Sequence, residues 1–384
     1  MKCKLSDICV FRKGKVEVAN LNTKNYISTE NMLSNKSGIT DASSLPTVSL
    51  TQEYKNGDVL VSNIRPYFKK IWHAQYDGGC SNDVLVFVPR SNTDSDFLYY
   101  VLADDDFFTY SMVTSKGTKM PRGDKTSIMQ YAVPMVDFCT QKKIASVLKS
   151  LDEKIELNNA INENLEQQLR SVFMELFSDK IANVEANNHR PLGELVINID
   201  NRGKTPPFET TPTEYPIIDV RALSGTSRIV NYANCTKFVS AETYSSWFRS
   251  GHPKPKDILV STVGSLAEIK IFLGSKGCIA QNVVGFRTKD ISPYYLYQYL
   301  TAIKNDLVAY NIGSVQPSIK VTHIIKHPIY IPSTEELETF DALAESATNA
   351  IYNNTLESER LAGIRDALMP KLMSGEIDLS EVQF

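Results

Sequence analysis

The stretch Asn56-Gly57-Asp58-Val59-Leu60-Val61-Ser62 returns in the second half of this 384-residue chain as Pro255-Lys256-Asp257-Ile258-Leu259-Val260-Ser261. Other segments repeat in the same order, namely Gly79-Cys80 as Gly277-Cys278, Phe97-Leu98-Tyr99-Tyr100 as Tyr295-Leu296-Tyr297-Gln298, and Gly117-Thr118 as Gly313-Ser314. The offset between the copies stays at 196 to 199 residues, close to half of the chain. A duplicated chain presents two similar surfaces, so we expect a ligand with two parts.

Each copy has the pattern of a mixed α/β globule followed by a long helix. Short apolar runs bounded by Gly and Pro predict strands, at residues 58–64, 84–89, 257–262, 269–273 and 283–287. One helix is expected in each globule, at residues 96–111 and 293–311. The predicted fold class is therefore α/β (α+β), with globules at residues 1–140 and 190–332 and helices at residues 141–182 and 333–384.

The two long helices carry apolar residues that are spaced by four and three, which predicts a coiled coil. The first seam comprises Ile144, Leu148, Leu151, Ile155, Asn158, Asn162, Leu165, Leu169, Val172 and Leu176. The second comprises Phe340, Leu343, Ala347, Ala350, Asn354, Leu361, Ile364 and Leu368. We expect the two helices to pair antiparallel with pseudo-twofold internal symmetry. At about 1.5 Å per residue the first is on the order of 55 Å long, enough for a spacer.

Asparagines interrupt both seams, at Asn158, Asn162 and Asn354. A buried Asn in a coiled-coil core lowers stability and fixes the register or the choice of partner. Asn158 and Asn354 are equivalent in the repeat, so we expect them to lie near each other. The alternative is that the seam drifts and both side chains are solvent-exposed.

Charge is distributed unevenly, although the net charge is only −3. Residues 191–332 carry 15 Lys/Arg and 10 Asp/Glu, whereas residues 333–384 carry 3 and 11. The acidic final helix is expected to face solvent or a protein partner rather than phosphates. Because no long apolar run is present, we expect a soluble, cytoplasmic chain that does not contact a membrane. Its six cysteines form no C-x-x-C pair, so we expect reduced thiols and no structural zinc.

Catalytic motifs are missing from the sequence. No G-x-G-x-x-G occurs, and Gly117 and Gly123 are spaced too widely for a P-loop. The set Asp257, Glu268 and Lys270 resembles the carboxylates and lysine of metal-dependent nucleases, but the first copy aligns Lys69 with Glu268. We therefore expect no catalytic residue and no metal site in this chain.

Together these features resemble the specificity subunits of type I restriction–modification systems, the HsdS family. The resemblance covers essentially the whole chain and rests on the order of five segments. They are Gly57-Asp58-Val59-Leu60-Val61-Ser62-Asn63-Ile64-Arg65-Pro66-Tyr67, Gln141-Lys142-Lys143-Ile144-Ala145, Leu192-Gly193-Glu194-Leu195, Gly203-Lys204-Thr205-Pro206 and Leu368-Met369-Pro370-Lys371-Leu372-Met373-Ser374-Gly375-Glu376-Ile377.

The resemblance implies two target-recognition domains, each of which reads one half of a split, asymmetric site on double-stranded DNA. It also implies that the helices set the spacing and dock two modification subunits, which bind S-adenosylmethionine and methylate adenine. A restriction subunit, which uses ATP and Mg²⁺ for translocation and cleavage, would complete the complex. No cofactor would reside in this chain.

Phosphate contacts favour Lys, Arg and small hydroxyls, and base contacts favour Arg, Lys, Asn and Gln. The DNA-binding candidates in the first globule are Arg65, Lys69, Lys70, Lys116, Thr118, Lys119 and Arg122. Those in the second globule are Arg202, Lys204, Lys276, Ser314, Gln316 and Lys320. The alternative for each is plain solvated surface.

Two other functions remain open from the residues. The first is a coiled-coil scaffold that recruits proteins without DNA specificity. The second, disfavoured by the missing motifs, is a stand-alone nuclease or methyltransferase.

Overall fold

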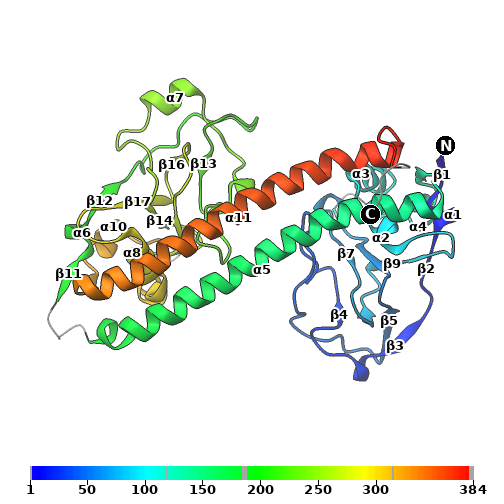
Figure 1. Ribbon diagram of the computed structural model, residues 1–384, viewed down its shortest axis with the longest axis horizontal. Coiled ribbons are helices and arrows are strands. Elements are labelled where there is room, and N and C mark those ends of the chain that lie inside the picture. The colour runs from blue at the N-terminus through cyan, green and yellow to red at the C-terminus, as the bar shows by residue number, and fades with distance from the viewer. Residues whose placement is uncertain (1, 118, 184–187, 314, 380–384) are drawn as a thin grey trace. The chain divides into compact units, whose positions relative to one another are not determined.

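The computed structural model describes residues 2–117, 119–183, 188–313 and 315–379. The chain divides into two compact units. Unit 1 comprises Met1–Ile155 and Glu359–Phe384, and unit 2 comprises Glu156–Ser358. The long helices α5 (Phe138–Ala182) and α11 (Thr334–Ser374) each contribute a segment to both units (Figure 1). Each unit therefore consists of one globule with two helix segments packed on it.

The globule of unit 1 is built on two four-stranded sheets and one two-stranded sheet. The first four-stranded sheet has the order β2 (Cys9–Phe11), β9 (Val84–Pro89), β6 (Val59–Ser62), β7 (Ile71–His73). The second has the order β3 (Lys15–Glu17), β5 (Leu50–Tyr54), β8 (Gly78–Cys80), β4 (Tyr26–Ile27), and β1 (Lys2–Lys4) pairs with β10 (Ala132–Pro134). The helices are α1 (Leu5–Ile8), η1 (Val18–Asn20), η2 (Pro66–Phe68), α2 (Ser95–Ala103), α3 (Asp105–Val113) and α4 (Lys125–Ile128).

Unit 2 repeats the main four-stranded sheet and the terminal two-stranded sheet, whereas the second sheet of unit 1 returns as one pair of strands in the described residues (Figure 1). Its four-stranded sheet has the order β12 (Val196–Ile199), β17 (Val283–Thr288), β14 (Ile258–Ser261), β15 (Ile269–Ile271). The two-stranded sheets are β13 (Ile217–Ile218) with β16 (Cys278–Ile279) and β11 (His189–Pro191) with β18 (Pro328–Tyr330). The helices are α6 (Leu192–Leu195), η3 (Tyr232–Asn234), α7 (Ala241–Ser246), α8 (Pro293–Ala302), α9 (Lys304–Ala309) and α10 (Val321–Ile324).

The strand registers confirm the duplication. Val59 faces Phe87 in unit 1, and Ile258 faces Phe286 at the equivalent position in unit 2. The parallel pairing of β4 with β8 likewise returns as the pairing of β13 with β16. The fold class that was predicted from the sequence is therefore confirmed.

Single helices were expected at residues 96–111 and 293–311, and this was wrong in both globules. The first divides into α2 and α3, because Asp104 adopts an extended conformation and its carboxylate caps α3 by accepting from the Asp106 N–H at 3.0 Å. The second divides into α8 and α9 at Ile303. The sequence prediction missed both breaks, because the residues around them are all compatible with a helix.

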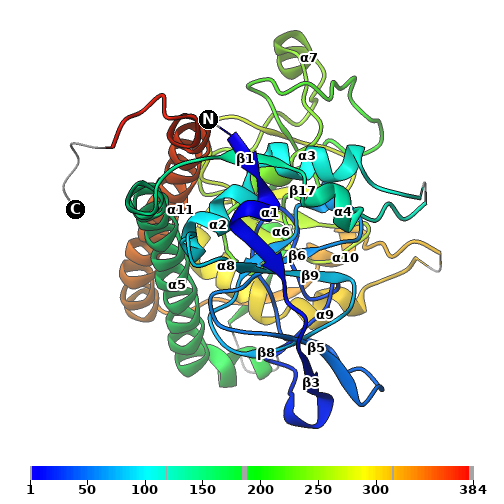
Figure 2. The same cartoon turned by 90° about the vertical axis from the view of Figure 1, so that its right-hand side faces the viewer.

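The long helices take part in the core of each globule. In unit 1, Ile144 and Leu148 of α5 pack in one buried cluster with Leu372 of α11. In unit 2, Phe173 of α5 packs with Phe340 of α11, with ring centroids 5.5 Å apart. Figure 2 shows α5 and α11 beside helix α2, which contributes to the same buried cluster of unit 1. Within each unit the two segments run antiparallel, as predicted.

The α11 seam differs in part from the prediction. Leu343 and Ile364 were expected to be buried, but their exposed fractions are 43% and 37%. Ala344 and Thr348 are fully buried instead. The segment of α11 around Leu343 packs on the globule of unit 2 as well as on α5, so its buried face is set by two neighbours and departs from a simple heptad.

The seam asparagines form a polar cluster inside unit 2. Asn158 is fully buried, and its Nδ2 donates to Glu357 Oε2 at 2.8 Å and lies 3.5 Å from the Asn354 carbonyl oxygen. Asn354 Nδ2 donates to Asn162 Oδ1 at 2.9 Å. Asn158 and Asn354 are thus neighbours, as expected. Their role in fixing the register stays a prediction.

Candidate nucleic-acid interface

In unit 1, two segments that carry predicted DNA contacts lie together at one end of the main sheet. The turn after β6 contains Arg65, whose backbone N–H donates to the Pro121 carbonyl at 2.9 Å. Pro121 belongs to the glycine loop, which is closed by reciprocal backbone bonds of 2.9 and 3.0 Å between Lys116 and Arg122. The structure therefore brings Arg65 next to the loop that contains Lys116, Lys119 and Arg122.

Unit 2 uses the same backbone contacts with different side chains. The Gly264 N–H donates to the Pro317 carbonyl at 3.1 Å, and the Ile312 N–H closes the second glycine loop by donating to the Ser318 carbonyl at 2.9 Å. Gly264 corresponds to Arg65, and Pro317 corresponds to Pro121. In both units, the same backbone arrangement therefore holds the turn after the strand against the glycine loop. We call this arrangement the shared frame.

The turns have left-handed backbone at equivalent positions. Arg65 has a φ of 51°, and its counterpart Gly264 has a φ of 85°. Lys69 and Ala267, at the second equivalent position, have φ values of 50° and 54°. Glycine adopts this region freely, whereas side chains with a Cβ are disfavoured there and such residues cluster at functional sites.

Most of the predicted cations of unit 1 are held by acceptors of the same unit. Lys69 Nζ pairs with Asp105 at 2.7 Å, Lys116 Nζ with Asp124 at 2.6 Å, and the Arg122 guanidinium with Asp83 at 3.1 Å. Lys70 Nζ donates to the Thr29 carbonyl at 2.6 Å, and burial lowers the pKa of Lys70. The Lys116 ammonium lowers the pKa of Asp124 to about 2.

Lys119 differs from this set because its side chain is exposed and has no partner within the described part of the chain. Thr118, its neighbour in the same loop, lies outside the described residues. Ion pairs at a solvent-exposed surface contribute little to stability, so Lys116 and Arg122 can exchange their carboxylates for phosphates at small cost.

Of the candidates in unit 2, Arg202 is held and Lys204 is exposed. Arg202 binds Asp200 in a bidentate contact of 2.8 and 2.7 Å, which lowers the pKa of Asp200. Thr205, next to Lys204, accepts a hydrogen bond from Gln281 Nε2. Gln281 precedes Asn282, whose carbonyl accepts from the Thr262 N–H at 2.7 Å. This chain of contacts connects the segment around Lys204 to the turn that contains Gly264.

Three further candidates in unit 2 have different placements. Gln316 and Lys320 are exposed on and beside the glycine loop, whereas Ser314 lies outside the described residues. Lys276 follows β15, whose last residue Ile271 pairs with Ile258 at the start of β14, so Lys276 lies at the opposite end of the sheet. It pairs with Glu214 at 2.5 Å. The structure does not bring Lys276 together with the other candidates.

Exposed apolar side chains in the glycine loops were missed by the sequence analysis. Met120 has an exposed fraction of 46%, and Val315 has one of 98%. Apolar side chains can contact the thymine methyl group in the major groove or wedge between base steps. The signal was available, because both residues lie within a short run of glycine, hydroxyl and basic residues.

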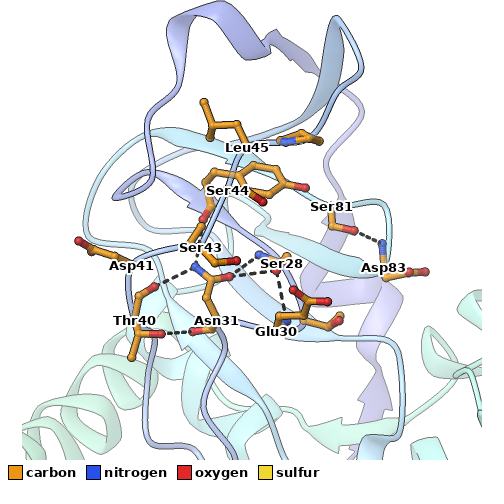
Figure 3. A pocket seen from close by; sticks show the side chains of 14 residues that line it. Ser28, Glu30, Asn31, Thr40, Asp41, Ser43, Ser44, Leu45, Ser81 and Asp83 are labelled. Carbon is orange, nitrogen blue, oxygen red and sulfur yellow. Dashed lines mark hydrogen bonds between the residues drawn. The ribbon is translucent and has the colours of Figure 1, made fainter.

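Unit 1 also contains a polar cavity of about 490 Å³ beside this interface (Figure 3). Asp83, which pairs with Arg122 of the glycine loop, lines it together with Glu30 and Asp41. Asn31 holds its wall, because its Nδ2 donates to the carbonyls of Tyr26 and Thr40 at 3.0 and 2.8 Å. The carboxylates disfavour a phosphate in this cavity.

The nuclease-like residues of unit 2 are engaged in separate contacts. Asp257 binds Arg287 at 2.7 Å, and Glu268 pairs with Lys304 at 2.9 Å. Lys270 Nζ donates to the carbonyls of Gly225 and Ser227. Within the described ranges, no cluster of three His, Cys, Asp or Glu residues could hold a metal ion.

The structural register also corrects one pairing of the repeat. The sequence alignment of the two copies paired Glu268 with Lys69. The registers of β7 and β15 show instead that Glu268 is equivalent to Lys70, because the turn of unit 2 is one residue shorter. Ala267 is consequently the counterpart of Lys69, and the two share left-handed backbone.

The cysteines are free thiols. Burial raises the pKa of the repeat-equivalent residues Cys80 and Cys278 to about 12, so both are protonated near neutral pH. None of the helices in the described residues is both long and apolar enough to span a bilayer.

The comparisons with known proteins all match specificity proteins of type I restriction systems. The family model described as type I restriction modification DNA specificity domain matches residues 1–167 and 186–357. The chain is 24% identical over 438 aligned positions to the specificity subunit of the type I restriction enzyme HindI from Haemophilus influenzae, covering 92% of this chain and 94% of that protein. It is also 24% identical over 314 positions to the MjaIX specificity subunit from Methanocaldococcus jannaschii, covering 77% and 72%.

Among solved structures, the chain resembles the S subunit of a type I restriction–modification system from M. genitalium. The TM-score is 0.59 at 16% identity, and the match covers 97% of this chain and 96% of that chain. At this level of identity the likeness concerns the fold.

Proposed function

The chain belongs to the type I restriction–modification DNA specificity family, and from this membership we propose that each unit reads one half of a bipartite, asymmetric DNA site. Sequence-specific recognition of DNA is the property of the family. The assignment of one half-site to each unit goes beyond this family property and is a proposal.

One observation carries this proposal. The contact of the turn with the glycine loop is the same in both units, with Arg65 N–H to Pro121 in one and Gly264 N–H to Pro317 in the other. The side chains on that frame differ, with Lys119 and Met120 in unit 1 opposite Val315 and Gln316 in unit 2. Equal backbone with unequal side chains is what two readers of unequal sequences require.

We further propose that the globules extend over residues 1–140 and 190–332 and that the helices at 141–182 and 333–384 set the spacing of the half-sites. The helices would also dock two modification subunits. Exposed apolar side chains on unit 2 segments of the helices, at Leu157, Ile161 and Leu356, support a protein partner there. Adenine methylation would occur on the modification subunits and ATP-driven cleavage on a restriction subunit, so this chain would be a non-catalytic, cytoplasmic subunit.

The proposal is tested with the chain co-expressed with its modification subunit. The variant Lys119→Ala/Arg122→Ala removes two cations from the glycine loop of unit 1. We expect weaker binding to cognate DNA in a gel shift. A base-reading residue should cost about 1–3 kcal/mol and relax one position, whereas a phosphate contact should weaken every sequence and lower the salt slope.

Lys13→Ala/Lys15→Ala is the matched control, since it removes two exposed cations of the same unit outside the glycine loop and the turn. Its affinity should equal that of the wild type. Unchanged affinity in the loop variant would remove this loop from the interface. Absence of any sequence preference in the wild-type complex would instead favour a scaffold without DNA specificity.

A further inference from the structure

Arg65 occupies a position whose backbone suits glycine. Its φ of 51° and ψ of 65° are left-handed, and unit 2 has Gly264 at this position with a φ of 85°. The position is fixed in both units by the backbone bond to the proline of the glycine loop, at 2.9 Å in unit 1 and 3.1 Å in unit 2. Arginine is disfavoured in this conformation and glycine is not, so the presence of arginine calls for a compensating role.

That role is not found inside the protein. Within the described residues the Arg65 side chain has no hydrogen bond and no ion pair, and its Nε is buried without a partner. Lys69, Lys116 and Arg122, in contrast, all pair with carboxylates. Asn63, two residues earlier, has a buried Oδ1 that is also unpartnered. Buried polar atoms without partners are rare, and two in one short segment indicate a surface that is completed by a ligand.

The chemistry of the side chain favours a base over a phosphate. The phosphate backbone is the same in both half-sites, so a phosphate contact at this fixed position should be shared by the two units. Gly264 offers no side chain for it. A base contact, in contrast, is expected to differ between unequal half-sites. The commonest specific contact of arginine is a bidentate one to O6 and N7 of guanine in the major groove.

We propose that Arg65 reads a guanine in the half-site of unit 1, and that unit 2 has no reader at the equivalent position. This inference rests on the proposed function. It separates Arg65, as a determinant of specificity, from the neighbouring cations.

The decisive variant is Arg65→Gly, which installs the residue of unit 2 and relieves the left-handed backbone. Binding of the co-expressed complex is measured on cognate duplex and on duplexes in which each base pair of the site is replaced singly. We expect cognate affinity to fall by about 10- to 100-fold and discrimination to be lost at one G·C pair only. The melting temperature should equal or exceed that of the wild type, because glycine suits this backbone.

Asn35→Gly is the control for backbone relief. Asn35 is exposed, lies in the same unit and has a φ of 57°, and its variant should keep wild-type discrimination at every position. An equal loss on all duplexes with a shallower salt dependence would show a phosphate contact and overturn the inference. A lowered melting temperature of Arg65→Gly would show a structural role and do the same. If the wild-type complex itself fails to discriminate between sequences, the result contradicts the proposed function rather than the role of Arg65 alone.

Discussion

In each unit a charged contact joins the globule to the segments of α5 and α11. This contact, called the joint below, involves equivalent positions in the two units but different residues. In unit 2, Arg228 of the globule has a side chain only 1% exposed and binds Glu166 of α5 through Nε and Nη2 at 3.0 and 2.8 Å. Its Nη1 donates to Thr348 of α11 at 2.7 Å. In unit 1, Arg365 of α11 binds Asp152 of α5 at 2.6 Å, and Tyr100 of the globule donates to the same carboxylate at 2.7 Å.

The positions correspond although the residues do not. Asp152 is equivalent to Thr348, and Tyr100 is equivalent to Gln298, whose Oε1 lies 3.5 Å from Arg228. The duplication has therefore preserved the backbone and the site of the joint, while the arginine now comes from the globule in one unit and from the helix in the other. The side-chain networks of the two copies changed independently of their shared frame.

The largest effect is expected at the buried joint. Arg228→Leu should lower the stability of unit 2 by about 3–5 kcal/mol, because it removes a buried guanidinium that also binds Thr348 and leaves the Glu166 carboxylate without its ion pair. Arg365→Leu should cost less than half as much in unit 1, since the Arg365 side chain is 23% exposed and that of Arg228 only 1%. The chain has one tryptophan in each unit, Trp72 and Trp247, so denaturant unfolding of single-tryptophan variants reports on each unit separately.

The double variant Glu166→Leu/Arg228→Leu sharpens this comparison. Replacement of both partners removes the unpaired carboxylate, so part of the lost stability should return. Equal costs for Arg228→Leu and Arg365→Leu would show that the two joints do not differ in strength.

A smaller effect is expected in the pH dependence of the stability of unit 2. At one sheet position unit 2 has Lys270 where unit 1 has Trp72. Burial lowers the pKa of Lys270 to about 8. Between about pH 8 and the ordinary lysine pKa the unfolded state holds more protons than the folded state, so this group makes unit 2 more stable as the pH rises. Below pH 8 the penalty for burying the charge is fully present.

Other groups titrate in the same range, so the measurement is the difference between the wild type and Lys270→Met. This difference should shift in favour of the wild type by about 2–3 kcal/mol between pH 8 and 10.5. Denaturant unfolding followed at Trp247 provides the values. A difference that is flat with pH would mean that Lys270 is not desolvated in solution.

The smallest effect is expected in the polar cluster of unit 2. Asn158 is fully buried and its Oδ1 has no partner, so Asn158→Leu should raise the stability of unit 2 by about 1 kcal/mol. If Asn158 fixes the register, the same variant should impair assembly or DNA binding. Asn159→Leu is the control, because Asn159 is exposed on the same helix. A more stable variant with unchanged assembly and DNA binding would refute the register role.

The sequence was most informative where a pattern is local. The apolar run at residues 84–89 coincides with β9, and the seam around Leu148 and Leu169 predicted helix pairing, because both patterns follow directly from backbone periodicity. Two helices were predicted too long, since the cap formed by the Asp104 side chain competes with a helix-compatible run.

The candidate site was predictable as a set of loops but not as a surface. Gly117 and Gly313 identified the equivalent loops, whereas the placement of Lys276 at the far end of the sheet depends on strand register. The left-handed backbone of Arg65 was also hidden, because an arginine in a turn gives no sequence signal for positive φ.

The central claim is that two units with the same backbone arrangement read different half-sites. The most direct test is to determine the methylated DNA motif in cells that express the chain with its modification subunit. The account predicts an adenine-methylated motif of two unequal specific parts separated by unspecified bases. Arg65→Gly should then relax one position in one part and leave the other part intact. A single contiguous motif, or a change in both parts from this one substitution, would contradict the account.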